Sequence, residues 1–122
     1  MRKKFLPFSL PRIGEKEKKE ILDSLDSGWI TTGPKAIEFE EKVAEYVGSK
    51  YAIAMSSCTA ALHISLVALR IEEKAEVITS PFTFCSTINV IMHQKAKPIF
   101  VDIRKDTFNI DENKIEEKIT SK

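Results

Sequence analysis

The sequence has little of several features that would point to a specialised class of protein. It contains two cysteines in 122 residues, Cys58 and Cys85, and they lie far apart and outside any Cys-x-x-Cys spacing. This pattern gives weak support to a zinc site or a redox motif. We therefore expect both cysteines to be reduced thiols that act as small hydrophobic side chains.

Long apolar runs are also missing from the sequence. No segment approaches the length that spans a bilayer. The basic residues at positions 2–4 are followed by Pro7 and Pro11, which interrupt the chain before the apolar stretch of a signal peptide can develop. We interpret residues 1–13 as an N-terminal arm and expect a cytoplasmic protein with no membrane partner.

Charge of one sign does not dominate the composition. The 19 basic and 18 acidic residues give a formal net charge of +1, which argues against a nucleic-acid partner and against an acidic tail. With 43% hydrophobic and 30% charged residues, the composition is that of one globular domain with a single core. Any partner must therefore be inferred from local motifs.

Apolar residues at helical spacing predict two helices in the first half of the chain. A repeat of isoleucine and leucine indicates a helix within residues 14–27, which the glycine-bounded segment 28–33 ends. Pro34 suits the first position of the next helix, and Gly48 supplies its left-handed stop.

Short β-rich runs alternate with helical patterns in the rest of the chain. Their lack of polar alternation is typical of a parallel sheet covered by helices, so the predicted fold class is α/β. The predicted strands are residues 51–55, 76–79 and 98–102. One predicted helix follows each of the first two strands, and a third occupies residues 111–122.

The turn at residues 56–63 reads Ser-Ser-Cys-Thr-Ala-Ala-Leu-His and opens a helix. The first amides of a helix have no partner within it and attract negative charge. Hydroxyls on Ser57 and Thr59, with small side chains at Ala60 and Ala61, leave room for a phosphate. Alternatively, Ser57 only caps the helix. The local sequence supports these two roles equally.

A second turn, at residues 79–87, should emerge at the same edge of the sheet. It carries Phe82 and Phe84, and an exposed ring there could stack on a flat heteroaromatic group. The alternative is that both rings point into the core. This turn shifts the balance toward a ligand site that combines a phosphate cradle with an aromatic surface.

Four motifs, at residues 28–34, 56–63, 76–84 and 96–102, occur in one order over nearly the whole chain. Together they make it similar to the N-terminal third of the DegT/DnrJ/EryC1/StrS family. These proteins are nucleotide-sugar aminotransferases that depend on pyridoxal 5′-phosphate (PLP) and have the aspartate aminotransferase fold, fold type I. The resemblance implies that residues 14–122 are the incomplete N-terminal part of the family's large domain.

The resemblance also implies roles for individual residues. Trp29 lies in the motif next to the substrate mouth, but packing is the favoured role for it, and the place of His63 on the flank of its helix favours a structural role over a catalytic one. The residues expected to bind the cofactor are Ser57, Thr59 and Ala60, around its phosphate, and Phe84, on its pyridine ring. The residues expected to line the substrate mouth are Thr31, Thr32 and Gly33.

The family's chemistry moves an amino group from a donor such as glutamate to a keto-sugar nucleotide, and some members use the same cofactor for dehydration. The lysine that forms the family's Schiff base lies downstream of the matched motifs. No residue of this chain is therefore assigned as catalytic, and the isolated chain is expected to be inactive. It would work as part of a homodimer or with a complementing C-terminal chain. The alternatives are a non-catalytic phosphate- or PLP-binding fragment and a remnant of a split or decayed gene.

The family's topology and glycine pattern raise two further expectations. In the family sheet, the first strand is separated from the next two by strands that come later in the chain, so residues 51–55 would have an unpaired edge and the chain would fold poorly alone. Residues 70–75 and Lys95 replace turns in which the family usually has glycine. A left-handed conformation kept at such a position would cost about 1 kcal/mol.

Overall fold

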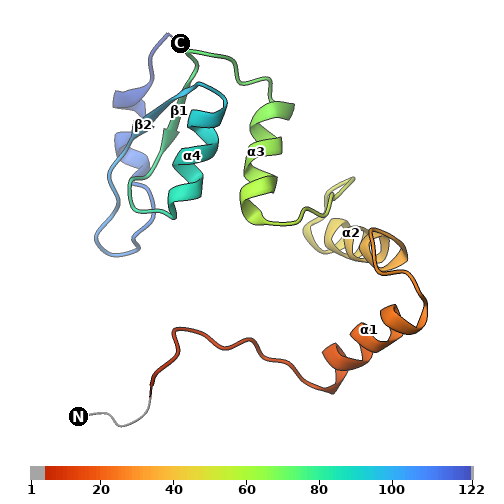
Figure 1. The fold of residues 1–122 in the computed structure, drawn as a ribbon. Coiled ribbons are helices and arrows are strands. Elements are labelled where there is room, and N and C mark those ends of the chain that lie inside the picture. Colours follow the sequence, from red (N-terminus) through yellow and green to blue (C-terminus); the bar gives the residue numbers. More distant parts are fainter. Residues whose placement is uncertain (1–4, 122) are drawn as a thin grey trace. The chain divides into compact units, whose positions relative to one another are not determined.

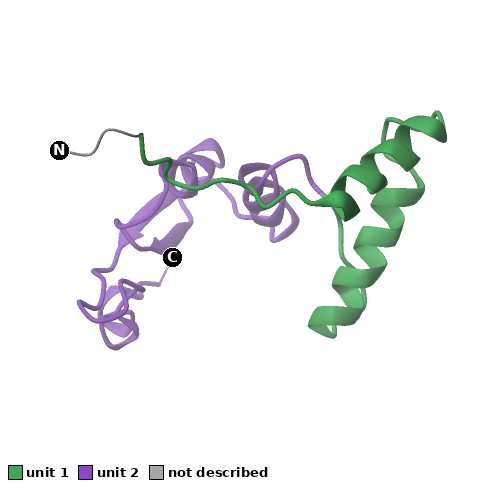
Figure 2. Cartoon of the chain, turned by 90° about the horizontal axis from the view of Figure 1, so that it is seen from below, with its two compact units in different colours: residues 1–54 green, residues 55–122 purple. Residues whose placement is uncertain are grey.

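The structure is a computed structural model that describes residues 5–121, so residues 1–4 of the expected arm and Lys122 lie outside the described part. The chain divides into two compact units, residues 1–54 and 55–122, and each is described by itself (Figure 2). In chain order the elements are α1 (Glu15–Asp26), α2 (Pro34–Val47), α3 (Cys58–Ala68), β1 (Glu76–Thr79), α4 (Cys85–His93), β2 (Lys97–Phe100) and the short 3₁₀ helices η1 (Glu112–Lys114) and η2 (Glu116–Lys118) (Figure 1).

The first unit consists mainly of α1 and α2. Gly14 precedes α1, and its backbone amide donates a hydrogen bond to the Glu17 carboxylate over 2.6 Å. Pro34 occupies the first turn of α2 as predicted. An ion pair between Lys35 and Glu20 joins the two helices, and the Glu20 carboxylate, through this hydrogen bond, raises the pKa of Lys35.

The second unit contains a two-stranded parallel sheet. Glu76 of β1 lies opposite Lys97 of β2, and Thr79 lies opposite Phe100. The four buried hydrophobic side chains of the described residues come from α4 and from the segment around β2: Val90, Ile91, Ala96 and Val101. The α/β fold class is confirmed as a partial domain with one parallel strand pair.

Helix α3 packs against α4 in this unit. The rings of His63 and His93 meet edge to face, with their centroids 5.9 Å apart. His63 therefore lies in the contact between the helices, which agrees with a structural role.

The predicted first strand, residues 51–55, is wrong. The segment is extended but pairs with no strand in the part of the chain that the structure describes, and the sheet has two strands rather than three. Tyr51 and Ile53 are each 74% exposed. Ala54 N donates a hydrogen bond to a side chain instead, Glu40 Oε1, over 2.8 Å. Apolar composition predicted a strand here without a partner for it, whereas the family topology anticipated that its neighbouring strands would be missing.

The predicted last helix is also wrong, because η1 and η2 are two single 3₁₀ turns. Asp111 caps the first of them by accepting a hydrogen bond from Asn113 N over 3.2 Å. The segment has two apolar positions, and Ile119 is 65% exposed. Without a packed apolar face, a helix this short does not outweigh the cost of nucleation.

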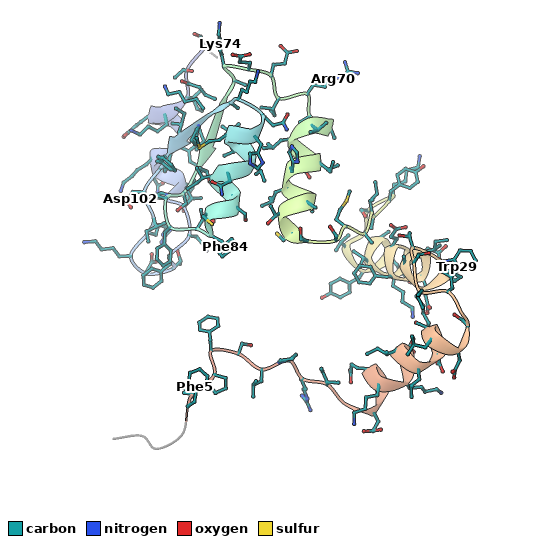
Figure 3. All side chains as sticks on the ribbon, viewed as in Figure 1. Phe5, Trp29, Arg70, Lys74, Phe84 and Asp102 are labelled. Atoms are coloured by element: carbon teal, nitrogen blue, oxygen red, sulfur yellow. The ribbon has the colours of Figure 1, made fainter. Side chains whose placement is uncertain are left out.

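Left-handed backbones occur in the two turns where the resemblance implies glycine. Arg70, Lys74 and Lys95 have φ of 55°, 75° and 56°. Figure 3 labels Arg70 just past α3 and Lys74 in the loop before β1. Each of these turns therefore carries the conformational cost that a glycine would avoid.

In residues 5–121, no helix has both the length and the apolar character needed to cross a membrane.

Candidate cofactor-binding site

The first turn of α3 provides hydrogen-bond donors at its exposed end. Ser57 is the N-cap, and its hydroxyl oxygen accepts a hydrogen bond from Ala60 N over 3.1 Å. Ala61 N donates to the Ser57 carbonyl over 3.0 Å. Within the described residues, the amides of Cys58 and Thr59 donate no hydrogen bond to another group of the protein. Two amides of the positive helix end therefore remain available for an anion.

Ser57 can serve as a cap and as an anion donor together. A hydroxyl has two lone pairs and one proton, so accepting from Ala60 N leaves its O–H free to donate. Ser57 and Thr59 are both exposed, and Ala60 is half-buried. The two roles that the sequence left open are therefore compatible in this geometry.

The start of α4 presents an aromatic ring. Phe84 is the N-cap residue of α4, and its side chain is 76% exposed. Phe82 is 64% exposed and packs against Phe108, with the ring centroids 5.8 Å apart. Neither ring enters the core, so the core alternative does not hold. Phe84 has no ring partner among the described residues and can accept a flat ligand.

The turn that carries Phe84 is held by short polar contacts. Phe82 N donates to Ser80 Oγ over 3.1 Å, and the hydroxyls of Thr83 and Thr87 lie 3.0 Å apart. The contact between Phe82 and Phe108 also joins this turn to the loop that follows β2. These contacts hold the backbone of the turn that carries Phe84 in place.

The starts of α3 and α4 lie at the same end of the second unit (Figures 1 and 3). Phe84 follows the carboxyl end of β1, and ligands of α/β proteins bind at this edge of the sheet. The structure therefore brings Ser57, Thr59, Ala60 and Phe84 to one edge. The donors suit a phosphate, and the exposed ring suits a flat heteroaromatic group.

The three residues expected at the substrate mouth lie in the other unit, between α1 and α2. Thr31 and Thr32 are exposed, whereas Gly33 is buried. They adjoin a small cavity of about 120 Å³ lined by Asp23, Ser27, Trp29, Thr31, Gly33, Pro34 and Lys35.

The sequence interpretation missed the part played by Trp29. Its indole Nε1 donates a hydrogen bond to the Thr32 carbonyl over 2.9 Å, and its ring lies over Gly33. The available signal was a tryptophan placed four residues before a Gly-Pro pair. Packing was predicted for this residue, but the polar contact to the loop was not.

A parallel α/β unit with unpaired helix-end amides and an exposed ring at its carboxyl edge suits a cofactor-binding protein. The sequence profile of the DegT/DnrJ/EryC1/StrS aminotransferase family matches residues 11–122. The chain belongs to this family.

Relatives of known name match almost the whole chain. The chain is 57% identical over 122 residues to the uncharacterized protein MJ1066 of Methanocaldococcus jannaschii, covering all of this chain and 32% of that protein. It is 50% identical over 119 residues to the spore coat polysaccharide biosynthesis protein SpsC of Bacillus subtilis, covering 98% of this chain and 31% of that protein.

A solved structure agrees with the fold. The putative sugar aminotransferase Spr1654 of Streptococcus pneumoniae, in its PLP form, superposes with a TM-score of 0.87 at 42% identity, covering 94% of this chain and 29% of that one. The chain thus spans about a third of the length of the relatives it matches. PLP is the cofactor of this family's sugar aminotransferases.

Proposed function

We propose that this chain is the cofactor-phosphate-binding part of a PLP-dependent nucleotide-sugar aminotransferase. The observation that carries the proposal is the pairing of exposed amides at the start of α3 with the exposed ring of Phe84 at the start of α4. Family membership over residues 11–122 supports the same reading.

Each residue of the cradle has a distinct task in this proposal. The Thr59 hydroxyl and the Thr59 amide hold the phosphate, the Ser57 O–H adds a donor, and the small side chain of Ala60 leaves room beside them. Phe84 covers one face of the pyridine ring and keeps water from it. Bound PLP supplies an electron sink for amino-group transfer. The residues of this chain bind and orient the cofactor.

Thr31 and Thr32 are exposed and are proposed to contact the nucleotide-sugar substrate, while Gly33, covered by the Trp29 indole, shapes the same loop. An amino acid such as glutamate supplies the amino group, and the protein acts in the cytoplasm as a homodimer or with a complementing C-terminal chain. The name of the relative SpsC, which refers to polysaccharide biosynthesis, supports a sugar substrate.

Three of the four lysines that flank the sheet lie away from the cradle. Lys74 N donates to the Lys95 carbonyl over 3.4 Å, and Lys97 opens β2, so all three lie at the opposite edge from the cradle. Lys105 follows β2 at the carboxyl edge. We therefore propose that the 122-residue chain binds the cofactor but does not transaminate alone. The second candidate is a non-catalytic phosphate- or PLP-binding fragment or a gene remnant.

The test is a binding titration with pyridoxamine 5′-phosphate, which cannot label lysines through an aldehyde. The wild-type chain should bind it more tightly than pyridoxamine, which lacks the phosphate. Thr59→Ala should weaken binding about 10- to 100-fold, because a hydrogen bond to a charged group contributes about 1.5–3 kcal/mol. Ser56→Ala, one residue before the cap, is the matched control. Equal binding of the two ligands would reject the cradle.

Borohydride reduction in the presence of PLP tests the absence of a catalytic lysine. We expect no lysine to be labelled stoichiometrically, and Lys105→Arg identifies incidental labelling at the carboxyl edge. Full labelling of any single lysine, Lys105 included, would contradict the assignment. A binding-competent chain without any such lysine fits both candidates, and transaminase activity after addition of a C-terminal chain would favour the first.

A further inference from the structure

Gly33 is buried although the residues on both sides of it in the chain are exposed. It is the one buried residue in the described residues 5–54. Its φ of −166° is extended and needs no glycine. The indole of Trp29, itself 55% exposed, covers it.

The contact between Trp29 and Gly33 leaves no room for a side chain at position 33. A Cβ built on Gly33 would lie 2.6 Å from Cε2 of the indole and would overlap Nε1 and Cδ1 as well. Ring atoms cannot move aside individually, so the whole indole would have to leave. Gly33 is thus required by the ring and not by its own backbone conformation.

The same indole also fixes the loop through a polar contact. Nε1 donates to the Thr32 carbonyl over 2.9 Å. The Trp29 amide donates to Ser27 Oγ over 3.1 Å, and that hydroxyl donates to the Ser24 carbonyl over 2.7 Å. Trp29 is therefore anchored at the end of α1 and holds the loop that begins α2.

We propose that Trp29 is a positioning residue that holds the loop of residues 31–33 in one shape before substrate binds. This inference rests on the proposed function, in which Thr31 and Thr32 contact a nucleoside-diphosphate sugar. A loop already in its bound shape loses less freedom on binding. The residue acts through the loop and touches neither cofactor nor reacting atoms.

Backbone ¹⁵N relaxation of the full chain tests the positioning directly. Order parameters at residues 31–33 should be about 0.85 in the wild type and below about 0.6 in Trp29→Ala. Trp29→Phe keeps a ring over Gly33 without the donor, so it should restore most of the order. Gly33→Ala should behave like Trp29→Ala.

The single tryptophan of the sequence gives one indole N–H signal that reports the contact. Gly33→Ala should shift this signal to that of a solvated indole. Gly14→Ala is the matched control, because Gly14 also precedes a helix with an extended φ of −111° and no ring covers it. It should leave the indole signal and the loop order unchanged.

A double substitution isolates the coupling between the two residues. With Trp29→Ala in place, the added methyl of Gly33→Ala has nothing to meet, so the double variant should match the single Trp29→Ala variant in loop order. The proposal would be overturned if Gly33→Ala lowered the order of residues 31–33 equally with and without the indole. An unchanged indole signal in Gly33→Ala would also overturn it.

Ligand titration separates this inference from the proposed function. UDP-glucose and dTDP-glucose should each perturb the Thr31 and Thr32 amides in the wild type, and Trp29→Ala should weaken that binding about two- to tenfold. If neither sugar perturbs the loop, its proposed substrate role fails, whereas the relaxation data still decide whether Trp29 positions it. If the Trp29→Ala variant has a disordered loop and still binds the nucleotide sugars with wild-type affinity, positioning of the loop does not contribute to binding and this link is refuted.

Discussion

Replacing Arg70 with glycine should stabilise the end of α3. Arg70 has φ of 55° and occupies the position after the helix C-cap, where its amide donates to the Val67 carbonyl over 2.9 Å. Ile71 N donates to the Leu66 carbonyl over 3.1 Å. These two bonds form a Schellman motif, which usually places glycine at the left-handed residue.

The chain contains its own standard for this comparison. Helix α2 ends in the same motif, with Gly48 at φ of 69°. Its bonds run from Gly48 N to the Glu45 carbonyl over 3.2 Å and from Ser49 N to the Ala44 carbonyl over 3.0 Å. One turn type is thus formed with glycine at one helix end and with arginine at another.

The expected magnitude follows from two opposing terms. A left-handed backbone costs a residue with a side chain about 1–2 kcal/mol. Glycine recovers this cost but loses about 0.4–1 kcal/mol through the greater freedom of the unfolded chain. Arg70→Gly should therefore stabilise the end of α3 by about 0.5–1 kcal/mol, which is about a two- to fivefold change in an opening equilibrium.

Native-state hydrogen exchange can measure this change at individual amides. The amides of Leu69, Arg70 and Ile71 should exchange about two- to fivefold more slowly in Arg70→Gly. Gly48→Ala is the reverse control and should speed exchange at Ser49 by a similar factor. Unchanged or faster exchange in Arg70→Gly, alongside the expected effect of Gly48→Ala, would refute the reasoning for arginine.

Two further predictions concern α1 and the unpaired apolar segment. Hydrogen bonds from the backbone amides of Glu17 and Gly14 lower the pKa of Glu17 from its usual 4.5. These hydrogen bonds contribute fully to the stability of α1 above about pH 4.5, and the contribution is lost as the pH falls through the lowered pKa of Glu17 in the folded chain. Circular dichroism should therefore show an acid-induced loss of helix, and Glu17→Gln should reduce this loss. Ile53→Lys should reduce aggregation, seen as lower light scattering, without loss of helix, because Ile53 is 74% exposed in an unpaired extended segment. As a contrast, Val90→Lys should unfold the second unit, because the Val90 side chain is only 2% exposed. An unchanged acid transition in Glu17→Gln, or unchanged scattering in Ile53→Lys, would contradict these arguments.

Helix ends and the turn chemistry could be predicted from the sequence because their signals are local. Pro34 and Gly48 act on their own backbone dihedrals, and Ser57 caps amides within three residues of itself. The left-handed backbones at Arg70 and Lys95 could be expected only because the family resemblance implies glycine in residues 70–75 and at position 95. Each of these features depends on a few neighbouring residues.

Pairing and packing over longer distances could not be predicted in this way. The apolar run at residues 51–55 has strand composition, but a strand exists only where a partner offers amides and carbonyls. The ring contact of Phe82 with Phe108 joins residues 26 positions apart and leaves no local pattern. The sequence therefore located the Phe84 turn but not the contact that holds it.

The ring that covers Gly33 also constrains how this loop can change over evolutionary time. A methyl at position 33 requires the indole to leave first, so an ancestor could not acquire a side chain there without passing through a chain that lacked Trp29. Substitutions at the two positions are expected to occur in a fixed order, tryptophan before glycine. Related chains that keep the tryptophan should therefore keep the glycine, whereas chains that have lost the tryptophan are free to vary at both positions.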